Sequence, residues 1–424
     1  MLLILVLLFE TFTLAFLKEF GTVEAPNPLV LIFLSIATVA FILDLIRSRR
    51  FREIQSELAL AYIWRLFMLL FDRFGNMIYT LPNSGSDSEM FYYGAIRYMQ
   101  SGGWTRGFFV NVTGTLMRVV GTNQLFIQYL LMLCSIVTLY AFAEILRICR
   151  VDRAIYKNTI LVVGLLPNVA ILSSLFLRES IVAMFVTLSL ACFMRWLNRY
   201  GEYWYWVAFV FVFFAARFHS GTVGVALGYI VVRFIYDKKN QRIHVKARNL
   251  IPTILFALIF AFLFLNYSDK LFGKMAGVES IEDIANTNTK GGSSYAQYVG
   301  NSNSPISMVI FTIPRIVYFL FSPFPWQWRG IADIIAFVFS SLFYITALRS
   351  AYLAIRYSKE DCIKIKCLLV VAACITFIFA WGTANTGTAA RHREKAVIIY
   401  ATIWALSNEA LQLHVLKANT GERI

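Results

Sequence analysis

The chain has 424 residues, of which 59% are hydrophobic and 15% are charged, whereas soluble domains are about half apolar and about a quarter charged. This composition excludes a soluble enzyme, and it also excludes a disordered scaffold, which would need low hydrophobicity. The net charge of +15 lies mostly in short loops between apolar runs, as the positive-inside rule expects of a membrane protein. The sequence therefore predicts a protein that is surrounded by membrane lipids and does not bind nucleic acid.

Taken in chain order, about twelve apolar runs approach the roughly 20 residues that a membrane-spanning helix needs. They cover approximately residues 1–17, 28–47, 58–80, 123–147, 155–176, 179–197, 203–217, 219–236, 249–267, 331–349, 366–382 and 395–412. The first run lacks a basic segment before it and a small-residue cleavage site after it, so we expect a retained helix. We predict an all-α, polytopic integral membrane protein whose residues 1–424 form a single transmembrane domain.

A further apolar stretch, 308–328, contains Pro314, Pro323 and Pro325, which are expected to break a helix. If this stretch crossed the membrane, the basic loop 349–366 would lie outside. We therefore expect a re-entrant or interfacial segment at the lip of a cavity on the outer face, where covering protein can satisfy irregular backbone.

The basic loops indicate the orientation. Clusters of Arg and Lys follow the second, fourth, sixth and eighth spans and precede the eleventh, so we place these loops and both termini in the cytosol of a multi-pass protein of the cytoplasmic membrane. The sizeable outer segments are then 81–122, a first large outer loop with amphipathic segments, 268–307 and 383–394. The Gly-, Ser- and Asn-rich segment 268–307 is either a flexible connector or a mobile lid over a substrate groove.

With this orientation, unusual polar residues gather on the outer face. They are Asp87, Glu89, Arg178, Glu179, Arg217, His219, Arg329, Arg391, His392 and Arg393. Charge at membrane depth is expensive and usually functional, and guanidinium groups match phosphate oxygens bidentately. The small residues before Arg391 would also let backbone N–H groups approach an anion. The pattern predicts a site for a lipid-linked phosphate or pyrophosphate.

Structural alternatives stay open for several of these residues. Arg178 and Glu179 fit a helix-end pair, and His219 fits a capping or packing residue. Asp87 fits a capping segment for a helix that begins near Met90. Arg65 and Asp72, seven residues apart on one helical face, either pair structurally or line a cavity, and we favour the structural interpretation.

A known family shares this arrangement. Asp87 in the first large outer loop, followed by the aromatic-rich stretch from Met90, resembles GT-C-type membrane glycosyltransferases, which use polyprenyl-linked sugar donors. Leu177-Arg178-Glu179, Ser322-Pro323-Phe324-Pro325-Trp326 and Gly387-Thr388-Ala389-Ala390-Arg391-His392-Arg393 resemble Wzy-like (EpsG-like) bacterial polysaccharide polymerases. The resemblance covers most of the spans and rests on short motifs.

The resemblance implies a role for each candidate. Asp87 would be the base that activates an acceptor hydroxyl, with Glu89 as its substitute and His219 as a further catalytic candidate. Arg178, Arg217, Arg391 and Arg393 would hold the phosphate or pyrophosphate of the donor. Independently of the resemblance, Glu179, Arg329 and His392 are further substrate-binding candidates on the outer face. Ser88 follows Asp87 where the commonest GT-C pattern has a second acidic residue, so we expect no cofactor, although a divalent metal stays open. The partners would be lipid-linked oligosaccharide donors and acceptors, together with other polysaccharide-assembly membrane proteins.

The chemistry is coherent, because sugar transfer from a lipid phosphate needs a base near the acceptor and positive charge at the leaving group. No nucleotide-binding or hydrolase fingerprint appears in the sequence. Two alternatives are a flippase for lipid-linked sugars and a membrane O-acyltransferase with His219 or His392 as base. The outer-face bias of the charged residues argues against the flippase. An acyltransferase takes its acyl group from the cytosol, and the cytosolic loops contain His244 but no further combination of histidine and acidic residues for such a site.

Overall fold

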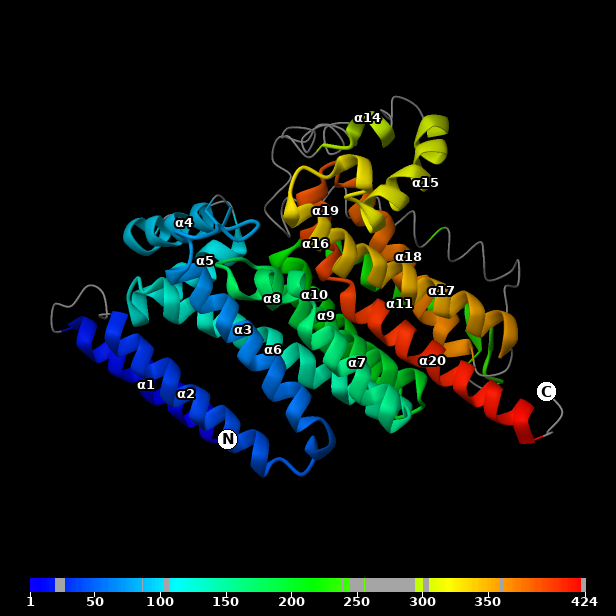
Figure 1. The fold of residues 1–424 in the computed structure, drawn as a ribbon, viewed down its shortest axis with the longest axis horizontal. Helices are drawn as coiled ribbons and strands as arrows, with labels where there is room; N and C mark the ends of the chain where they lie inside the picture. Colours follow the sequence, from blue (N-terminus) through cyan, green and yellow to red (C-terminus); the bar gives the residue numbers. More distant parts are fainter. Residues whose placement is uncertain are drawn as a thin grey trace. The chain divides into compact units, whose positions relative to one another are not determined.

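The computed structural model describes residues 1–19, 27–85, 87–102, 107–237, 240–243, 255, 294–299, 305–358 and 362–420. These residues are helical, apart from turns, the isolated bridge between Ser294 and Asn385, and the short antiparallel pair β1 (Tyr236–Asp237) and β2 (Arg242–Ile243). The predicted all-helical class is therefore confirmed (Figure 1).

The helices follow one another along the described chain. They are α1 (Leu2–Glu19), α2 (Asn27–Arg47), η1 (Arg52–Ile54), α3 (Gln55–Phe74), α4 (Asp87–Ser101), α5 (Phe108–Val120), α6 (Gln124–Cys149), α7 (Arg153–Leu165), α8 (Pro167–Ser174), α9 (Glu179–Leu197), α10 (Tyr203–Phe218), η2 (Ser220–Thr222), α11 (Val223–Ile235), α14 (Ala296–Val299), α15 (Pro305–Phe321), η3 (Pro325–Gln327), α16 (Ile331–Ala336), η4 (Phe337–Ser341), α17 (Leu342–Tyr357), α18 (Ile363–Trp381), α19 (Thr386–Glu394) and α20 (Val397–Thr420).

Within the described residues, six helices are long and apolar enough to cross a membrane, and the number rises to eight if each of two bent pairs is one span. The six are Pro28–Arg47, Arg52–Phe74, Gln124–Cys149, Glu179–Leu197, Ile331–Tyr357 and Ile363–Trp381. The chain is thus a multi-pass membrane protein with transmembrane helices, and the predicted count of about twelve is not reached among these residues.

The difference between the two counts has local causes. The predicted span 155–176 is bent by 52° between α7 and α8, because Pro167 lacks an N–H and disfavours a helical conformation at Leu166. The predicted spans 203–217 and 219–236 form shorter apolar helices. The predicted span 249–267 lies outside the described residues except for Leu255. The same holds for most of the predicted lid, 268–307, of which only 294–299 and 305–307 are described.

The proline-rich stretch differs from its prediction in where it breaks. Helix α15 continues through Pro314 and ends at Phe321. The break comes at Ser322 and the cis-linked Pro323, followed by the short turn η3. One internal proline therefore leaves the helix intact here, and the later pair of prolines ends it.

The chain forms two compact units. Unit 1 comprises Met1–Leu139, Ile160–Leu165 and Val169–Ile181, and unit 2 comprises Tyr140–Thr159, Leu166–Asn168 and Val182–Ile424. In unit 1, an apolar cluster around Met68 includes Leu81 and the α8 residues Ile171 and Leu172. This cluster holds α3, α8 and the loop before α4 together.

The polar residues of α3 are satisfied inside unit 1. Arg65 donates from Nε to Ser135 Oγ (2.5 Å) and from Nη1 to the carbonyl oxygen of Gly164 (2.5 Å). Asp72 accepts hydrogen bonds from Ser84 Oγ (2.6 Å) and Gln128 Nε2 (3.0 Å). Both side chains are buried, so these contacts support the structural interpretation of Arg65 and Asp72.

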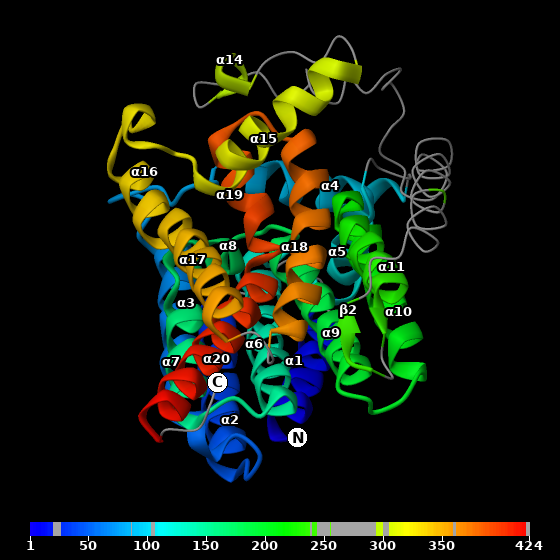
Figure 2. The same ribbon diagram turned by 90° about the vertical axis from the view of Figure 1, so that its right-hand side faces the viewer.

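In unit 2, α11 packs closely along α18, and Figure 2 shows the two helices side by side. A Cβ added at Gly224 would lie 2.6 Å from Ile375 Cα, and one added at Gly228 would lie 2.6 Å from Val371 Cα. Small residues at this spacing let two helix backbones approach in a membrane, where packing rather than water exclusion drives association. This contact fixes the end of α10 and η2 beside the end of α18.

Candidate functional site

Two histidines that are distant in sequence meet in unit 2. Nε2 of His219, the residue after α10, lies 3.2 Å from Nε2 of His392 in α19. His392 Nδ1 lies 2.9 Å from Thr383 Oγ1. One Nε2 atom must donate and the other accept, because two N–H groups cannot point at each other. The structure therefore brings two predicted site residues into a single hydrogen-bonded chain that ends at Thr383.

Phe379, near the end of α18, supports this pair from one side. Its ring centroid lies 5.2 Å from that of His219 and 4.9 Å from that of His392. A Cβ added at Gly221 would lie 2.4 Å from the same ring, so only glycine lets the turn after His219 approach so closely. The imidazoles are therefore held by packing as well as by hydrogen bonds.

Helix α19 begins with a side-chain cap. Asn385 Oδ1 accepts hydrogen bonds from the backbone N–H groups of Gly387 (2.9 Å) and Thr388 (3.3 Å). This is the capping role that asparagine commonly has at a helix N-terminus. Two of the donors expected to approach an anion are thus used by the cap, so this turn differs from the predicted anion cradle.

Arg393 is enclosed by the helices around it. Its Nη1 donates to the carbonyl oxygen of Leu320 (2.6 Å) and contacts Ser341 Oγ (3.3 Å), while Tyr344 donates its hydroxyl to the Arg393 carbonyl (2.8 Å). The Arg393 side chain is 1% exposed and Arg391 is 8% exposed. In this arrangement Arg393 ties α19 to α15, η4 and α17.

A pocket of about 240 Å³ opens at the start of α19. Its lining residues are aromatic and polar: Ser294, Tyr298, Trp326, Gln327, Trp328, Arg329, Asp333 and Thr386. The predicted site residue Arg329 is among them and is exposed. The arrangement offers flat aromatic faces together with a guanidinium, a carboxylate and an amide.

Local contacts shape the turn that supplies most of this lining. Gln327 Oε1 accepts the backbone N–H of Phe324 (2.9 Å), and Trp328 Nε1 donates to the carbonyl oxygen of Pro323 (3.2 Å). Asp333 Oδ2 accepts the backbone N–H of Arg329 (2.9 Å). These bonds hold the turn while leaving Trp326 64% exposed and Trp328 36% exposed.

A short segment connects the pocket to the histidine pair. Ser294 bridges to Asn385, and the Tyr295 N–H donates to the Ala384 carbonyl (2.9 Å). The Tyr295 hydroxyl donates to the Thr383 carbonyl (3.2 Å), and burial raises the pKa of this phenol above its ordinary value. Tyr295 therefore stays a neutral donor, and it fixes the segment from Thr383 to the start of α19, which contacts both parts of the site.

Unit 1 carries the acidic candidates. Asp87 and Glu89 both lie in the first turn of α4, where the helix dipole stabilises negative charge. Two residues correspond to about 200° around a helix, so these carboxylates point to opposite sides. The helix begins at Asp87 rather than near Met90, and this position fits the capping alternative as well as a catalytic one.

Arg178 lies against the same helix. Its guanidinium carbon is 5.6 Å from the ring centroid of Phe91. Phe91 is four residues after Asp87 and so shares its face of α4. The structure therefore places Asp87 and Arg178 on one side of α4, while Glu179 is buried at the first position of α9.

The remaining candidate, Arg217, is half-buried in the last turn of α10 in unit 2. In the part of the chain that the structure describes, no group of three or more His, Cys, Asp or Glu side chains could hold a metal ion. The site chemistry available in unit 2 is therefore aromatic, guanidinium, imidazole and a single carboxylate at the pocket.

Several residues of this site escaped the sequence analysis. Asp333, Tyr298 and Thr383 carry no motif, and their role follows only from the folded chain. Trp326 and Trp328 lie in the proline-aromatic stretch that the sequence marked as the lip of a cavity. Asp333, four residues after Arg329, is the one whose spacing could have signalled a local contact.

Comparisons with protein-family models, with curated proteins and with solved structures find no match for this chain. The class that the fold defines is a multi-pass helical membrane protein. Any narrower assignment depends on the chemistry of the site described above.

Proposed function

We propose that the protein is a membrane glycosyltransferase that polymerises polyprenyl-pyrophosphate-linked oligosaccharide repeat units at the outer face of the cytoplasmic membrane. The finer architecture that accompanies this proposal is a GT-C-like arrangement of about twelve spans with an interfacial segment near 308–328. The single observation that carries the proposal is the pocket beside α19, in which exposed tryptophans surround polar groups.

The pocket suits a sugar better than an apolar ligand. The flat faces of Trp326 and Trp328 can pack on the apolar face of a sugar ring, and Gln327 and Asp333 can exchange hydrogen bonds with its hydroxyls. A volume of about 240 Å³ is below the ~300–1,000 Å³ of pockets for drug-sized ligands. It fits a single sugar unit of a longer lipid-linked chain.

Transfer requires a base and a stabilised leaving group. The acceptor hydroxyl attacks the anomeric carbon, the bond from that carbon to the pyrophosphate oxygen breaks, and the pyrophosphate leaves with the electron pair. The acceptor proton passes to a carboxylate. Arg329 is the exposed guanidinium at the pocket, and positive charge there would stabilise the leaving pyrophosphate.

Three carboxylates are candidates for the base. The resemblance to GT-C enzymes implies Asp87, with Glu89 as its substitute, and the pocket itself contains Asp333. In this proposal Arg217 and Arg391 of unit 2 bind the lipid phosphate, and for Arg178 of unit 1 a donor-binding role is what the resemblance implies. The buried Arg393 and the paired His219 and His392 position α19 through Arg393 Nη1, which donates to the Leu320 carbonyl, and through the contact between the two Nε2 atoms.

The test uses purified protein in nanodiscs with extracted lipid-linked oligosaccharides, and it follows chain length by gel. Wild type is expected to give a ladder, and Trp328→Ala is expected to lose it. The matched control is Trp206→Ala on α10, since Trp206 is 68% exposed but does not line the pocket. Comparing Asp87→Asn with Asp333→Asn identifies the base, because only the base variant should lose the chemical step while still binding donor.

Other outcomes contradict the proposal. A ladder that Trp328→Ala leaves unchanged would make the tryptophans interfacial anchors of the kind found at membrane surfaces. Addition of one sugar without a ladder would indicate a single-transfer enzyme. Binding and translocation of the lipid-linked sugar without any extension would favour the flippase.

A further inference from the structure

A second pocket, of about 310 Å³, lies in unit 2 where α6 ends and α18 begins. Arg150 and Lys364 supply its cationic groups, and Ile363, Leu406 and Leu413 form an apolar wall. Leu413 is 37% exposed, so this wall continues onto the surface of α20. The pocket thus combines positive charge with an apolar flank.

This second pocket and the candidate sugar site lie near opposite ends of α18. α18 has 19 residues between Ile363 and Trp381, so its two ends are about 28 Å apart at 1.5 Å per residue. This length matches the roughly 30 Å thickness of a hydrocarbon core. Lys364 at one end and Thr383 beyond the other therefore correspond to opposite membrane interfaces.

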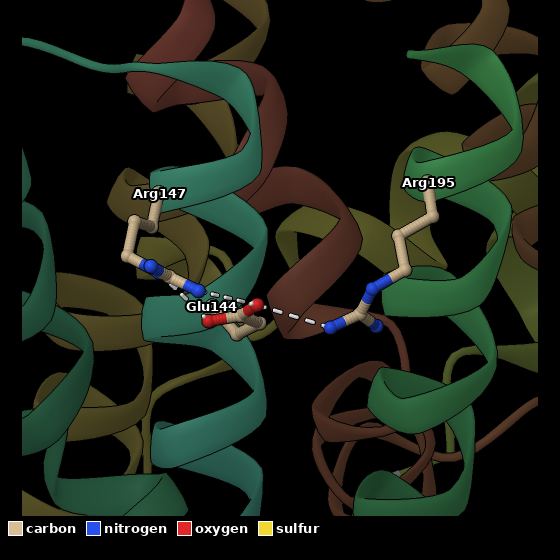
Figure 3. Close-up of polar contacts among 3 residues, drawn as sticks. All are labelled: Glu144, Arg147 and Arg195. Atoms are coloured by element: carbon tan, nitrogen blue, oxygen red, sulfur yellow. Dashed lines mark hydrogen bonds and ion pairs between the residues drawn. The ribbon is translucent and has the colours of Figure 1, made fainter. Parts of the chain in front are cut away.

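Among the described residues that line the pocket, two cations, Arg150 and Lys364, accompany one carboxylate, Glu409. Glu144 binds Arg147 (2.9 Å) and Arg195 (3.0 Å), and Figure 3 shows its carboxylate between the two guanidinium groups. The Arg150 side chain has no hydrogen-bond or ion-pair partner among the described residues. Glu409, the acidic residue of the pocket, accepts the backbone N–H of Asp152 (2.6 Å).

Lys364 and the helix it begins add donors to the pocket. Its Nζ donates to Asn198 Oδ1 (2.7 Å), and an ammonium group has two further protons to give. Cys362 provides no side-chain cap for the first N–H groups of α18. Free N–H groups and the helix dipole both favour an anion at this position.

The backbone at Arg150 is unusual for an arginine. Arg150 has φ of +58°, and the N–H groups of Arg150 and Val151 bond back to Arg147 and Leu146. This is the helix-ending motif that normally uses glycine at the left-handed position. Glycine suits this left-handed position better than arginine, so replacing Arg150 by glycine removes the side chain without straining the turn.

Arg199 provides a natural comparison. It has φ of +66° and ends α9 with the same pair of backbone bonds, from Arg199 to Trp196 and from Tyr200 to Arg195. It does not line the pocket. The two arginines share a backbone geometry and differ in what their side chains can reach.

We infer that the pocket between Arg150 and Lys364 binds the phosphate of an anionic membrane phospholipid, whose acyl chain lies along Leu406 and Leu413. The chemistry recognised is a phosphate group beside an apolar chain. In the proposed orientation this interface is cytosolic, and the cytoplasmic leaflet carries anionic lipids. The binding itself does not depend on the proposed enzymatic activity.

The test uses the full-length protein in neutral detergent, with bound lipid measured by native mass spectrometry and thermal unfolding. Phosphatidylglycerol is expected to bind and to raise the Tm, whereas phosphatidylcholine and inorganic phosphate are not. Arg150→Gly should keep or raise the lipid-free Tm, because glycine suits its backbone, yet weaken phosphatidylglycerol binding about fivefold. Arg199→Gly should bind as wild type does, and Lys364→Gln should bind more weakly.

Three results would overturn the inference. Equal binding of phosphatidylcholine would mean that charge does not matter. An equal effect of inorganic phosphate would make the ligand a soluble anion rather than a lipid. Unchanged lipid binding by both Arg150→Gly and Lys364→Gln would place the lipid elsewhere.

Discussion

The imidazole of His219 shares one hydrogen bond with the imidazole of His392, with 3.2 Å between their Nε2 atoms, across 173 residues of sequence. This contact joins the end of α10 to α19. We expect the two residues to be energetically coupled, because removing either ring takes this hydrogen bond from the Nε2 atom of the other.

A double-mutant cycle measures this coupling. His219→Ala and His392→Ala should each destabilise the protein, and the double variant should cost about 1 kcal/mol less than the sum of the two. The measurement is reversible denaturation in bicelles. Strictly additive effects would show that the rings do not interact.

Because α11 and α18 approach closely, we expect the stability of the protein to depend strongly on the size of the side chain at position 228. Gly228→Leu should lower the free energy of unfolding by about 1–3 kcal/mol, because its Cβ would meet Val371 Cα at 2.6 Å. Gly330→Ala is the control, since no atom lies within 4 Å of a Cβ at Gly330, and it should change stability by less than about 0.5 kcal/mol. Equal effects of the two substitutions would contradict the packing.

We expect the hydroxyl of Tyr344 to stabilise the folded protein, although the residue lies in an apolar region. Tyr344→Phe removes the donor to the Arg393 carbonyl and should cost about 1 kcal/mol of stability. Tyr352→Phe, on the same helix but 59% exposed, should be nearly neutral. A neutral Tyr344→Phe would mean that the hydroxyl does not hold α17 to α19.

The side-chain cap of α19 can be tested by comparing two substitutions of Asn385, one that removes the capping oxygen and one that keeps it. Asn385→Ala should cost about 1 kcal/mol, because the N–H groups of Gly387 and Thr388 lose their acceptor. Asn385→Asp keeps a capping oxygen and should retain most of the stability. Under the proposed function, polymer synthesis by the alanine variant should fall too, because Thr386 at the start of α19 lines the pocket that contains Trp326 and Trp328. Loss of stability by Asn385→Asp to the same extent would count against the cap.

Much of the helical architecture follows from local sequence. The predicted span 179–197 coincides with α9, Glu179–Leu197, because its acidic first residue and basic loop mark both ends of an apolar run. The bend at Pro167 was hidden inside a continuous apolar run. Hydropathy averages over such a run, whereas the backbone responds to the single missing N–H.

The site was less accessible to sequence reasoning. The charged outer turns pointed to α19, yet the contact of His219 with His392 depends on how α10, α11 and α18 pack. Arg393 has the chemistry of a phosphate ligand, but only the folded chain shows that it is buried and that its Nη1 contacts Leu320 and Ser341. Long-range packing decides which polar residues remain available to a substrate.

The position of Phe379 has a practical consequence for spectroscopy. Its ring touches His219, His392 and Phe319 at once, so ring currents from three neighbours act on one side chain. A fluorine atom placed on this ring would report, through a single resonance, any change in the tautomer or tilt of either imidazole. The protein thus offers one labelling position from which a rearrangement of α19 can be followed in a lipid bilayer.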